Sequence, residues 1–291
     1  MDFDLSELVA FIISSFLLIT FAYKWYFSLF FTWHSGRDHL EGLMLGTLPV
    51  ISFIIICYTL NVLASFDVVD NPIYIVFYMV MGYAWIYAGL TSMFFSFDIS
   101  WRDDVMNLNN KAALFSVAGG FIAHALIYSG ANIGDGPGWW CVVFAGGLGL
   151  AAWLVLGIIV NNFTGIFERI TIERDVPSGV RFCFYLLASG IILGRASAGD
   201  WTSFPMTVIE FAAGWPVLIL TALMIAIERY YKRVTGNFNK MKGNYLFSSV
   251  CCGILLIVLA IASLALMPQL PVNYGYRSAL PMMTTLKAAL F

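Results

Sequence analysis

Residues Trp139–Val160, WWCVVFAGGLGLAAWLVLGIIV, contain no charged side chain. A run of about 20 predominantly apolar residues is enough to cross the hydrocarbon core of a bilayer as a helix. The whole chain has the same character, since 60% of its 291 residues are hydrophobic and 11% are charged. Soluble domains carry about 25% charged residues, so this chain has too little charge to cover a surface in water. We therefore expect an all-α, multi-pass membrane protein.

Apolar runs of similar length recur on both sides of this stretch, separated by short polar connectors. Pro49 lies inside the second run, where a membrane helix tolerates proline if neighbouring groups satisfy the freed carbonyl. The runs predict eight transmembrane helices, at residues 8–30, 43–65, 73–97, 112–132, 138–161, 179–199, 205–228 and 245–267.

Lysine and arginine are concentrated in the connectors after the first, third, fifth and seventh predicted helices. These connectors and their helix edges hold 11 of the 15 basic residues: Arg37, Arg102, Lys111, Arg169, Arg174, Arg181, Arg229, Lys232, Arg233, Lys240 and Lys242. Cytoplasmic loops of membrane proteins carry an excess of Lys and Arg, so we expect these connectors in the cytoplasm and both termini outside. The net charge of −2 lacks the basic footprint of nucleic-acid-binding domains, and we expect no nucleic acid partner.

The chain also repeats itself with a period of 65 residues. Asp70, Asp135 and Asp200 fall in the same register, and the segments Ile127–Asp135 (IYSGANIGD) and Ile192–Asp200 (ILGRASAGD) share Ile, Ala, Gly and Asp at matching places. Self-similarity at a fixed period indicates a repeated structural unit. Each unit is predicted to be a helix, a tight outward turn that carries an Asp, and a returning helix. The predicted helices two to seven are then three helical hairpins, flanked by single first and eighth helices.

This pattern resembles a bacterial inner-membrane family built on domain of unknown function 350. Its members look like paired helical hairpins, with a small or amide residue opening each first helix and a small-residue turn before the second. The turns that match here are SGANIGD and RASAGD, and the openers are Asn109 with Asn110, Ser178 with Gly179, and Gly243 with Asn244. The resemblance covers about residues 43–267. It implies tandem four-span units at 1–133 and 134–267, an external tail at 268–291, an inner-membrane location and an envelope-stress setting, but no settled activity.

Three aspartates, Asp70, Asp135 and Asp200, each precede a helix on the outward side. An Asp in this place can cap the helix by accepting hydrogen bonds from its free backbone N–H groups. Pro72 and Pro137 suit the first turn of the helices that follow. We expect this capping role; the alternative is a ring of external carboxylates that attracts cations.

We single out four ionisable residues at membrane depth in the predicted helices, because burying a charge there is costly and such residues are candidates for function. Lys24 can extend its long side chain to the cytoplasmic interface. His124 lies near the middle of the fourth helix, where polar packing is the expected role and a proton-relay or ligand role is the alternative. Arg195 and Glu210 lie at matching depth on the sixth and seventh helices. We expect these two to pair, either as a structural ion pair or as part of a binding site.

The sequence shows no catalytic or cofactor-binding arrangement. An intramembrane serine protease needs a Ser and a His on different spans, and a bis-histidine haem needs two buried imidazoles, whereas His124 is the one His within a predicted helix. His34, Asp38 and His39 could meet a metal ion, but their spacing is imperfect and a fourth ligand is lacking. The five cysteines lie in apolar runs and form no CxxC pair. We expect no enzyme, no cofactor and no metal.

Two functions fit these features. A channel or transporter for a small ion or polar solute suits the internal repeats, with Lys24, His124, Arg195 and Glu210 along its path. The alternative is a non-enzymatic membrane partner or anchor, which would hold a cytoplasmic partner or anionic lipid at the basic seventh connector. In both cases the bilayer is the first partner. Copies of the chain or other membrane subunits would pack against the small residues of the fifth helix.

Overall fold

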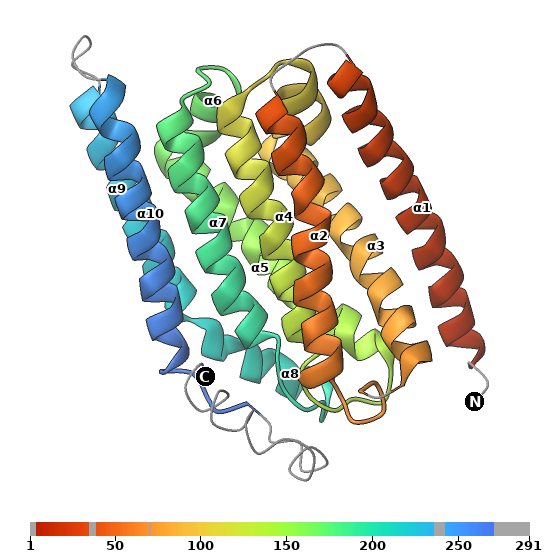
Figure 1. The fold of residues 1–291 in the computed structure, drawn as a ribbon. Coiled ribbons are helices and arrows are strands. Elements are labelled where there is room, and N and C mark those ends of the chain that lie inside the picture. The colour runs from red at the N-terminus through yellow and green to blue at the C-terminus, as the bar shows by residue number, and fades with distance from the viewer. Residues whose placement is uncertain (1–3, 35–38, 70, 236–241, 271–291) are drawn as a thin grey trace.

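The structure is a computed structural model that describes residues 4–34, 39–69, 71–235 and 242–270 (Figure 1). Within these ranges the chain is all-α, as predicted. The helices are α1 (Leu5–His34), α2 (His39–Val62), α3 (Pro72–Phe97), α4 (Lys111–Ala131), α5 (Trp139–Thr164), α6 (Ile166–Thr171), α7 (Val176–Ala196), α8 (Phe204–Phe211), α9 (Pro216–Thr235) and α10 (Lys242–Leu264).

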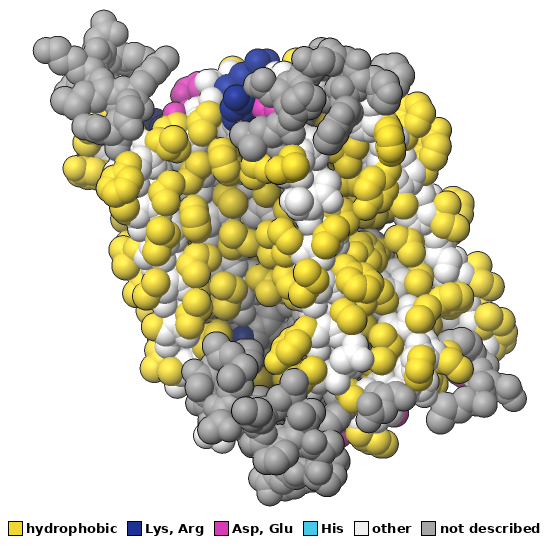
Figure 2. All heavy atoms as spheres, viewed as in Figure 1, with side chains coloured by type: hydrophobic (Ala, Val, Ile, Leu, Met, Phe, Trp, Pro, Cys, Tyr) yellow, Lys and Arg dark blue, Asp and Glu magenta, His cyan; other side chains and the backbone are white. Residues whose placement is uncertain are grey.

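Most of these helices can cross a membrane. In the described part of the chain, seven helices (α1, α2, α3, α4, α5, α7 and α10) are long and apolar enough, and the bent pair of α8 and α9 raises the number to eight if it counts as one span. Apolar side chains cover most of the visible face of the molecule (Figure 2). The predicted polytopic membrane fold is therefore confirmed.

The long helices form two layers (Figure 1). One layer contains α2, α4, α7 and α10 in this order, and the other contains α1, α3, α5 and α9. Helices of one layer run in the same direction, opposite to those of the other layer. The 65-residue repeat appears as a step along each layer, since α7 starts at Val176, 65 residues after α4 starts at Lys111.

The closest pair of helices is α4 and α7, in the middle of their layer. Glycines make this approach possible. A Cβ atom added to Gly119 would lie 2.6 Å from the carbonyl oxygen of Cys183, and one added to Gly130 would collide with the carbonyl of Gly194. Small residues let membrane helices pack backbone against backbone in this way. The predicted boundary between two four-span units falls just after α4, and the division into two units stays a prediction.

The seventh predicted helix, at 205–228, is not continuous. These residues form α8, a single 3₁₀ turn η2 (Ala212–Gly214) and most of α9, with a bend of 42° between the two segments. Pro216 is the first residue of α9 and has no backbone N–H with which to continue the preceding helix. The connector between α3 and α4 also departs from the expected polar loop, because Trp101–Asn107 form a π-helix, η1, capped by Ser100.

The two ends of the layers differ in charge. The end that holds the turns after α2, α4 and α7 is called the acidic end here, and the end that holds the connectors after α3, α5 and α9 is called the basic end. Lys and Arg side chains gather at the basic end in Figure 2, where α4 and α7 begin. α1 begins and α10 ends at the acidic end. Which side of the membrane each end faces stays a prediction, and most of the predicted C-terminal tail, residues 271–291, lies outside the described residues.

Candidate functional site

Three turns of the repeat lie side by side at the acidic end. Ala64, in the turn after α2, forms isolated bridges with Ile133 and Gly134 in the turn after α4. The turn after α7 joins them, because the Gly199 N–H donates to the Ile133 carbonyl at 3.0 Å and the Trp201 N–H donates to the Asp135 carbonyl at 2.7 Å. Backbone hydrogen bonds thus hold the three turns together.

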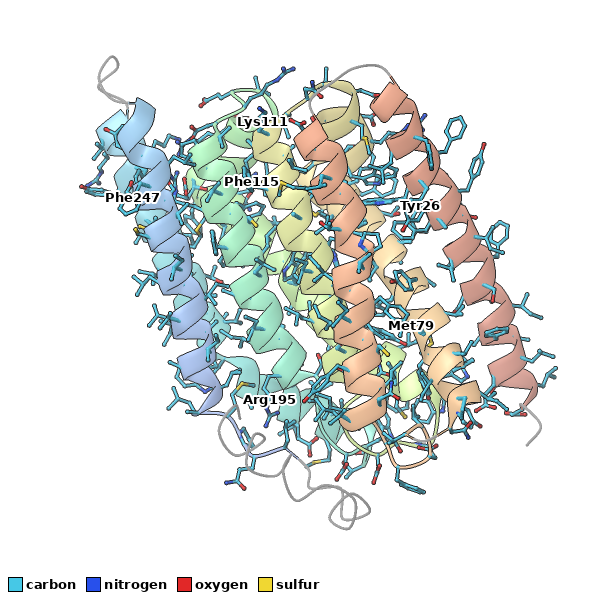
Figure 3. All side chains as sticks on the ribbon, viewed as in Figure 1. Tyr26, Met79, Lys111, Phe115, Arg195 and Phe247 are labelled. Atoms are coloured by element: carbon cyan, nitrogen blue, oxygen red, sulfur yellow. The ribbon has the colours of Figure 1, made fainter. Side chains whose placement is uncertain are left out.

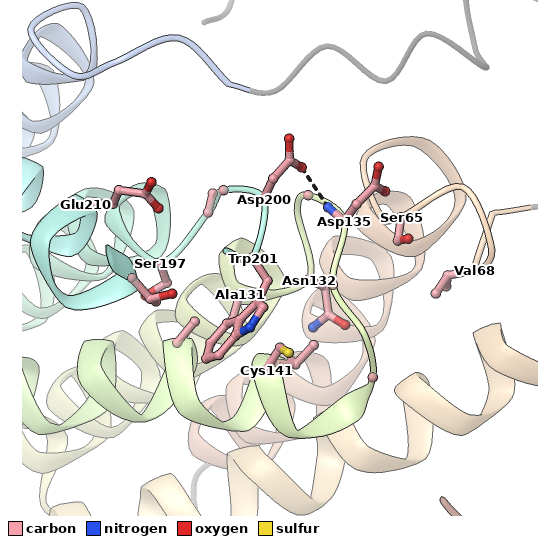
Figure 4. Close-up of a pocket in the computed structure, with 18 of the residues that line it drawn as sticks. Ser65, Val68, Ala131, Asn132, Asp135, Cys141, Ser197, Asp200, Trp201 and Glu210 are labelled. Carbon is pink, nitrogen blue, oxygen red and sulfur yellow. Dashed lines mark hydrogen bonds between the residues drawn. The ribbon is translucent and has the colours of Figure 1, made fainter. Parts of the chain in front are cut away.

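One aspartate side chain strengthens this contact. Asp200 Oδ1 accepts a hydrogen bond from the backbone N–H of Asp135 at 2.8 Å (Figure 4). The two residues are equivalent positions of the 65-residue repeat, so the repeat brings its own copies together. Gly134 and Gly199 make this possible, since both have positive φ and a Cβ on Gly134 would collide with Gly199.

The expected capping role is wrong for the two aspartates that the structure describes. α5 begins after Gly138, which makes no side-chain cap bond, and α8 begins after Ser203, whose Oγ accepts a backbone hydrogen bond from the first helical turn at 3.4 Å. Asp135 and Asp200 each lie three residues upstream of these caps, too far to reach the amides at N2 or N3. Asp70 lies outside the described residues.

A small pocket, with a volume of about 50 Å³ and partly open to solvent, lies among the three turns. Four carboxylates line it: Asp67, Asp135, Asp200 and Glu210. In Figure 4 the carboxylates of Asp135, Asp200 and Glu210 lie along one rim. Other polar or aromatic side chains complete the lining: Ser65, Tyr78, Asn132, Ser197, Trp201 and Thr207. None of the described lining residues is basic.

These carboxylates have few partners. Asp67 accepts from Ser65 Oγ, and Asp200 accepts from the Asp135 amide. Asp135 Oδ1 is buried and accepts no hydrogen bond from any described residue. Among the described residues, none of the four carboxylates forms an ion pair. Several like charges in one concavity attract counter-ions and raise their local concentration, and the chemistry of this pocket therefore suits a small cation.

Arg195 and Glu210 do not form the expected ion pair. Arg195 Nη2 donates to the carbonyl of Pro268, just beyond the end of α10. Glu210 instead lines the pocket from α8. The pairing rested on a continuous seventh helix antiparallel to the sixth, and the break before Pro216 removes that geometry. Figure 3 shows Arg195 at the end of α7 on the side of α10.

The other two intramembrane candidates lie away from the pocket. His124 is fully buried in α4, with its ring centroid 4.7 Å from that of Trp153. Neither of its ring nitrogens has a hydrogen-bond partner among the described residues. Lys24 Nζ donates to the hydroxyl of Tyr87 on α3 at 2.9 Å, so the structure gives this ammonium a partner within its own layer.

A group of buried charges at the basic end was not identified from the sequence. Arg181 on α7 and Glu228 on α9 are at most 1% exposed. Arg181 binds both carboxylate oxygens of Glu228, through Nε to Oε1 and through Nη2 to Oε2 at 3.0 Å. Arg169 on α6 donates to Glu228 Oε2 at 3.0 Å and to Asp175 Oδ2 at 2.9 Å. The signal was present, because Arg181 and Glu228 both lie within predicted helices.

Neutral groups complete this arrangement around Arg181. Its Nη1 donates to Ser249 Oγ on α10 at 2.6 Å, and its Nη2 donates to Ser178 Oγ at 3.0 Å. The guanidinium carbon lies 4.1 Å from the ring centroid of Tyr231, within cation–π range. We call Arg169, Asp175, Arg181, Glu228 and Ser249 the basic-end cluster. It connects α6, α7, α9 and α10.

No three His, Cys, Asp or Glu side chains of the described residues come together as a metal site. The side chains of His34, Asp38 and His39 lie outside that description. No protein-family model matches the chain, and neither a curated protein nor a solved structure is significantly similar to it. The resemblance to the inner-membrane family with domain of unknown function 350 therefore stays a prediction.

Proposed function

We propose that the protein is a membrane transporter for a small cationic solute, which binds in the pocket at the acidic end. The observation that carries this proposal is the lining of the pocket, with four carboxylates and no described basic residue. A buried carboxylate oxygen without a partner is unfavourable by about 1–3 kcal/mol or more. A bound cation would satisfy Asp135 Oδ1, which is in that state among the described residues.

The break between α8 and α9 supports transport over simple binding. Transporters commonly build their binding sites where a transmembrane helix is interrupted. Here Thr207 and Glu210 line the pocket from α8, one turn before the bend that leads into α9. A gated carrier fits better than an open channel, because the middle of the molecule is filled. Most residues of α4, in the middle of the molecule, are buried.

The alternative of a membrane anchor has less support. It depends on free basic side chains in the connector after α9. Arg229 Nε donates to the Phe163 carbonyl at 3.3 Å, and Lys232 Nζ donates to the Thr164 carbonyl at 3.4 Å. These two cations thus satisfy carbonyls at the end of α5, where positive charge is favourable. An envelope-stress role, a cytoplasmic partner and association with other subunits stay predictions.

Uptake into liposomes tests the proposal. The purified chain is reconstituted, and entry of radiolabelled methylammonium and of radioactive rubidium is compared with entry into empty liposomes. Asp135→Asn and Glu210→Gln are expected to reduce uptake of the transported cation roughly tenfold to a hundredfold, as is usual when a hydrogen bond to a charged group is lost. Glu173→Gln is the matched control, because Glu173 is an exposed carboxylate at the basic end.

Two results would contradict the proposal. The first is wild-type uptake of neither cation above that of empty liposomes. The second is uptake that Asp135→Asn and Glu210→Gln reduce no more than Glu173→Gln does. Circular dichroism and gel filtration in detergent establish that each variant is folded before its uptake is compared.

A further inference from the structure

Polar side chains follow one face of α7 from the basic end towards the pocket. Ser178, Arg181, Tyr185 and Ser189 are spaced by three or four residues, which places them on the same side of a helix. All four are buried, at 1% exposure or less. A buried face of this kind in a membrane helix requires partners on its neighbours, because polar groups in hydrocarbon are costly.

α9 supplies partners for Tyr185 and Arg181, whereas Ser189 donates to the Tyr185 and Leu186 carbonyls of its own helix. The hydroxyl groups of Tyr185 and Thr221 lie 2.9 Å apart and form a buried hydrogen bond. Seven residues later along α9, Glu228 binds Arg181. Two turns of helix separate Thr221 from Glu228, so both point to the same side of α9. We call this line of contacts between α7 and α9 the polar seam.

The polar seam runs from the basic-end cluster along the two elements that lead to the pocket. At the acidic end, α7 leads into Ser197 and α8 contributes Glu210, and both residues line the pocket. At the other end, Arg181 and Glu228 are in direct contact and almost inaccessible to solvent. The same two segments of chain therefore form the open pocket, the buried hydroxyl pair and the closed ion pair in succession.

We propose, resting on the proposed transport function, that the cationic solute moves along the polar seam and that the Arg181–Glu228 ion pair is its gate at the basic end. In this structure the gate is closed and the pocket is open. A cation that reaches Glu228 competes with Arg181 for the carboxylate, which weakens the ion pair and allows it to open. Arg181 keeps Ser178, Ser249 and the ring of Tyr231 as partners when this happens.

The rate of chemical labelling of Cys252 can report whether the gate is open. Its Sγ lies 3.8 Å from the hydroxyl of Tyr231, at the edge of the basic-end cluster. A maleimide reacts with a thiol that water can reach, so the labelling rate reports how often this region opens. The experiment uses full-length protein in which Cys252 is the only cysteine, in liposomes, with N-ethylmaleimide as the probe.

Glu228→Gln is expected to increase the labelling rate of Cys252 roughly tenfold or more, since it removes the charge that holds Arg181. Ser249→Ala removes one hydrogen bond to Arg181 and is expected to give a smaller increase. If Glu228→Gln does not fold, the labelling rate of Ser249→Ala alone tests the gate. Arg229→Gln is the control, because Arg229 is the next residue of α9 but donates to Phe163 and has no contact with Glu228. Unchanged labelling in Glu228→Gln and Ser249→Ala would overturn the gate.

The second part of the experiment measures Cys252 labelling with the cation added. Saturating methylammonium, or rubidium if that is the ion taken up, is expected to increase Cys252 labelling in protein with an intact ion pair but not in Asp135→Asn. Tyr185→Phe is expected to slow uptake while binding of the same cation in the pocket is kept. Uptake with no change in labelling upon addition of the cation would disprove the gate alone. Absence of any wild-type uptake would disprove the transport function, whatever the labelling shows.

Discussion

The acidic and basic ends of the molecule are held together by different forces. At the acidic end, backbone hydrogen bonds and glycine contacts join the turns after α2, α4 and α7. At the basic end, Gly179 packs against Ala112, but charged side chains are added to this contact, and Arg181 and Glu228 are buried against each other. The difference has a chemical consequence. Carboxylates that are not needed for cohesion stay available to a ligand, whereas those of the basic-end cluster are already occupied by arginines.

The largest effect is expected at the basic end. Glu228→Ala leaves Arg181 buried without its partner, and breaking one side of a buried ion pair usually lowers the free energy of unfolding by about 3–5 kcal/mol. Chemical unfolding in detergent, followed by tryptophan fluorescence, measures this. Glu173→Ala, which removes an exposed carboxylate at the same end, should change little. An effect of Glu228→Ala no larger than that of Glu173→Ala would mean that the cluster does not hold the helices.

Gly130→Ala tests the contribution of close packing at the acidic end. The added methyl group would collide with the Gly194 carbonyl and force α4 and α7 apart, and overpacking of this kind costs about 1–3 kcal/mol. Gly147→Ala is a matched control on α5, because a Cβ there meets nothing within 4 Å. The same unfolding assay measures both variants. If both behave alike, the contact between α4 and α7 is not what stabilises this end.

Asp200→Ala should have a smaller effect on stability, about 0.5–1.5 kcal/mol, because it removes one hydrogen bond, to the Asp135 amide. Asp135→Ala should cost less still, since the side chain of Asp135 neither caps α5 nor joins the turns. Thermal unfolding of the two variants in the same detergent measures the difference. A larger loss for Asp135→Ala would return this residue to a structural role and weaken the comparison between the two ends.

The smallest effect concerns pH. Partial burial raises the pKa of Asp104, in η1, above its ordinary value of 3.8, although the Ser100 N–H donates to this carboxylate and opposes the change. An acid with a raised pKa in the folded state favours folding when protonated. Wild-type protein should therefore lose stability relative to Asp104→Asn as the pH rises from below 3.8 through the raised pKa. Unfolding midpoints of both proteins across this range measure the difference, and parallel curves would contradict it.

Much of the fold could be predicted because membrane helices are specified by local composition. The eight apolar runs are properties of neighbouring residues, the 65-residue period is visible in the sequence, and the helices and layers follow both. The break at Pro216 could not be located in this way, because the apolar character continues across it. Close packing was also assigned to the small residues of α5, whereas Gly130 on α4 and Gly179 on α7 make the tightest backbone contacts between helices. Composition alone does not say which face of a helix meets its neighbour.

The candidate site was predicted only in part. Asp135 and Asp200 line one pocket, but the role expected of them depended on where the next helix begins. That starting point is set by Gly138 and Ser203. Asn110, which the resemblance places at the opening of a helix, does cap α4, because its side chain accepts hydrogen bonds from two backbone amides of that helix. The same side chain donates to the Ile170 carbonyl at 2.7 Å. The ion pair between Arg181 and Glu228 joins residues 47 positions apart, a distance at which no local pattern indicates a contact.

The order of helices along each layer also has a consequence for how the protein is made. Helices leave the ribosome in the sequence in which they lie side by side, so each new hairpin can add to the free edge of the array. Each helix still waits for its next neighbour in the layer, and the glycine face of α4 waits for α7, which starts 65 residues later. At ordinary rates of synthesis this interval lasts on the order of ten seconds. During that time the face of α4 that carries Gly119 and Gly130 meets lipid or an insertion factor instead of α7.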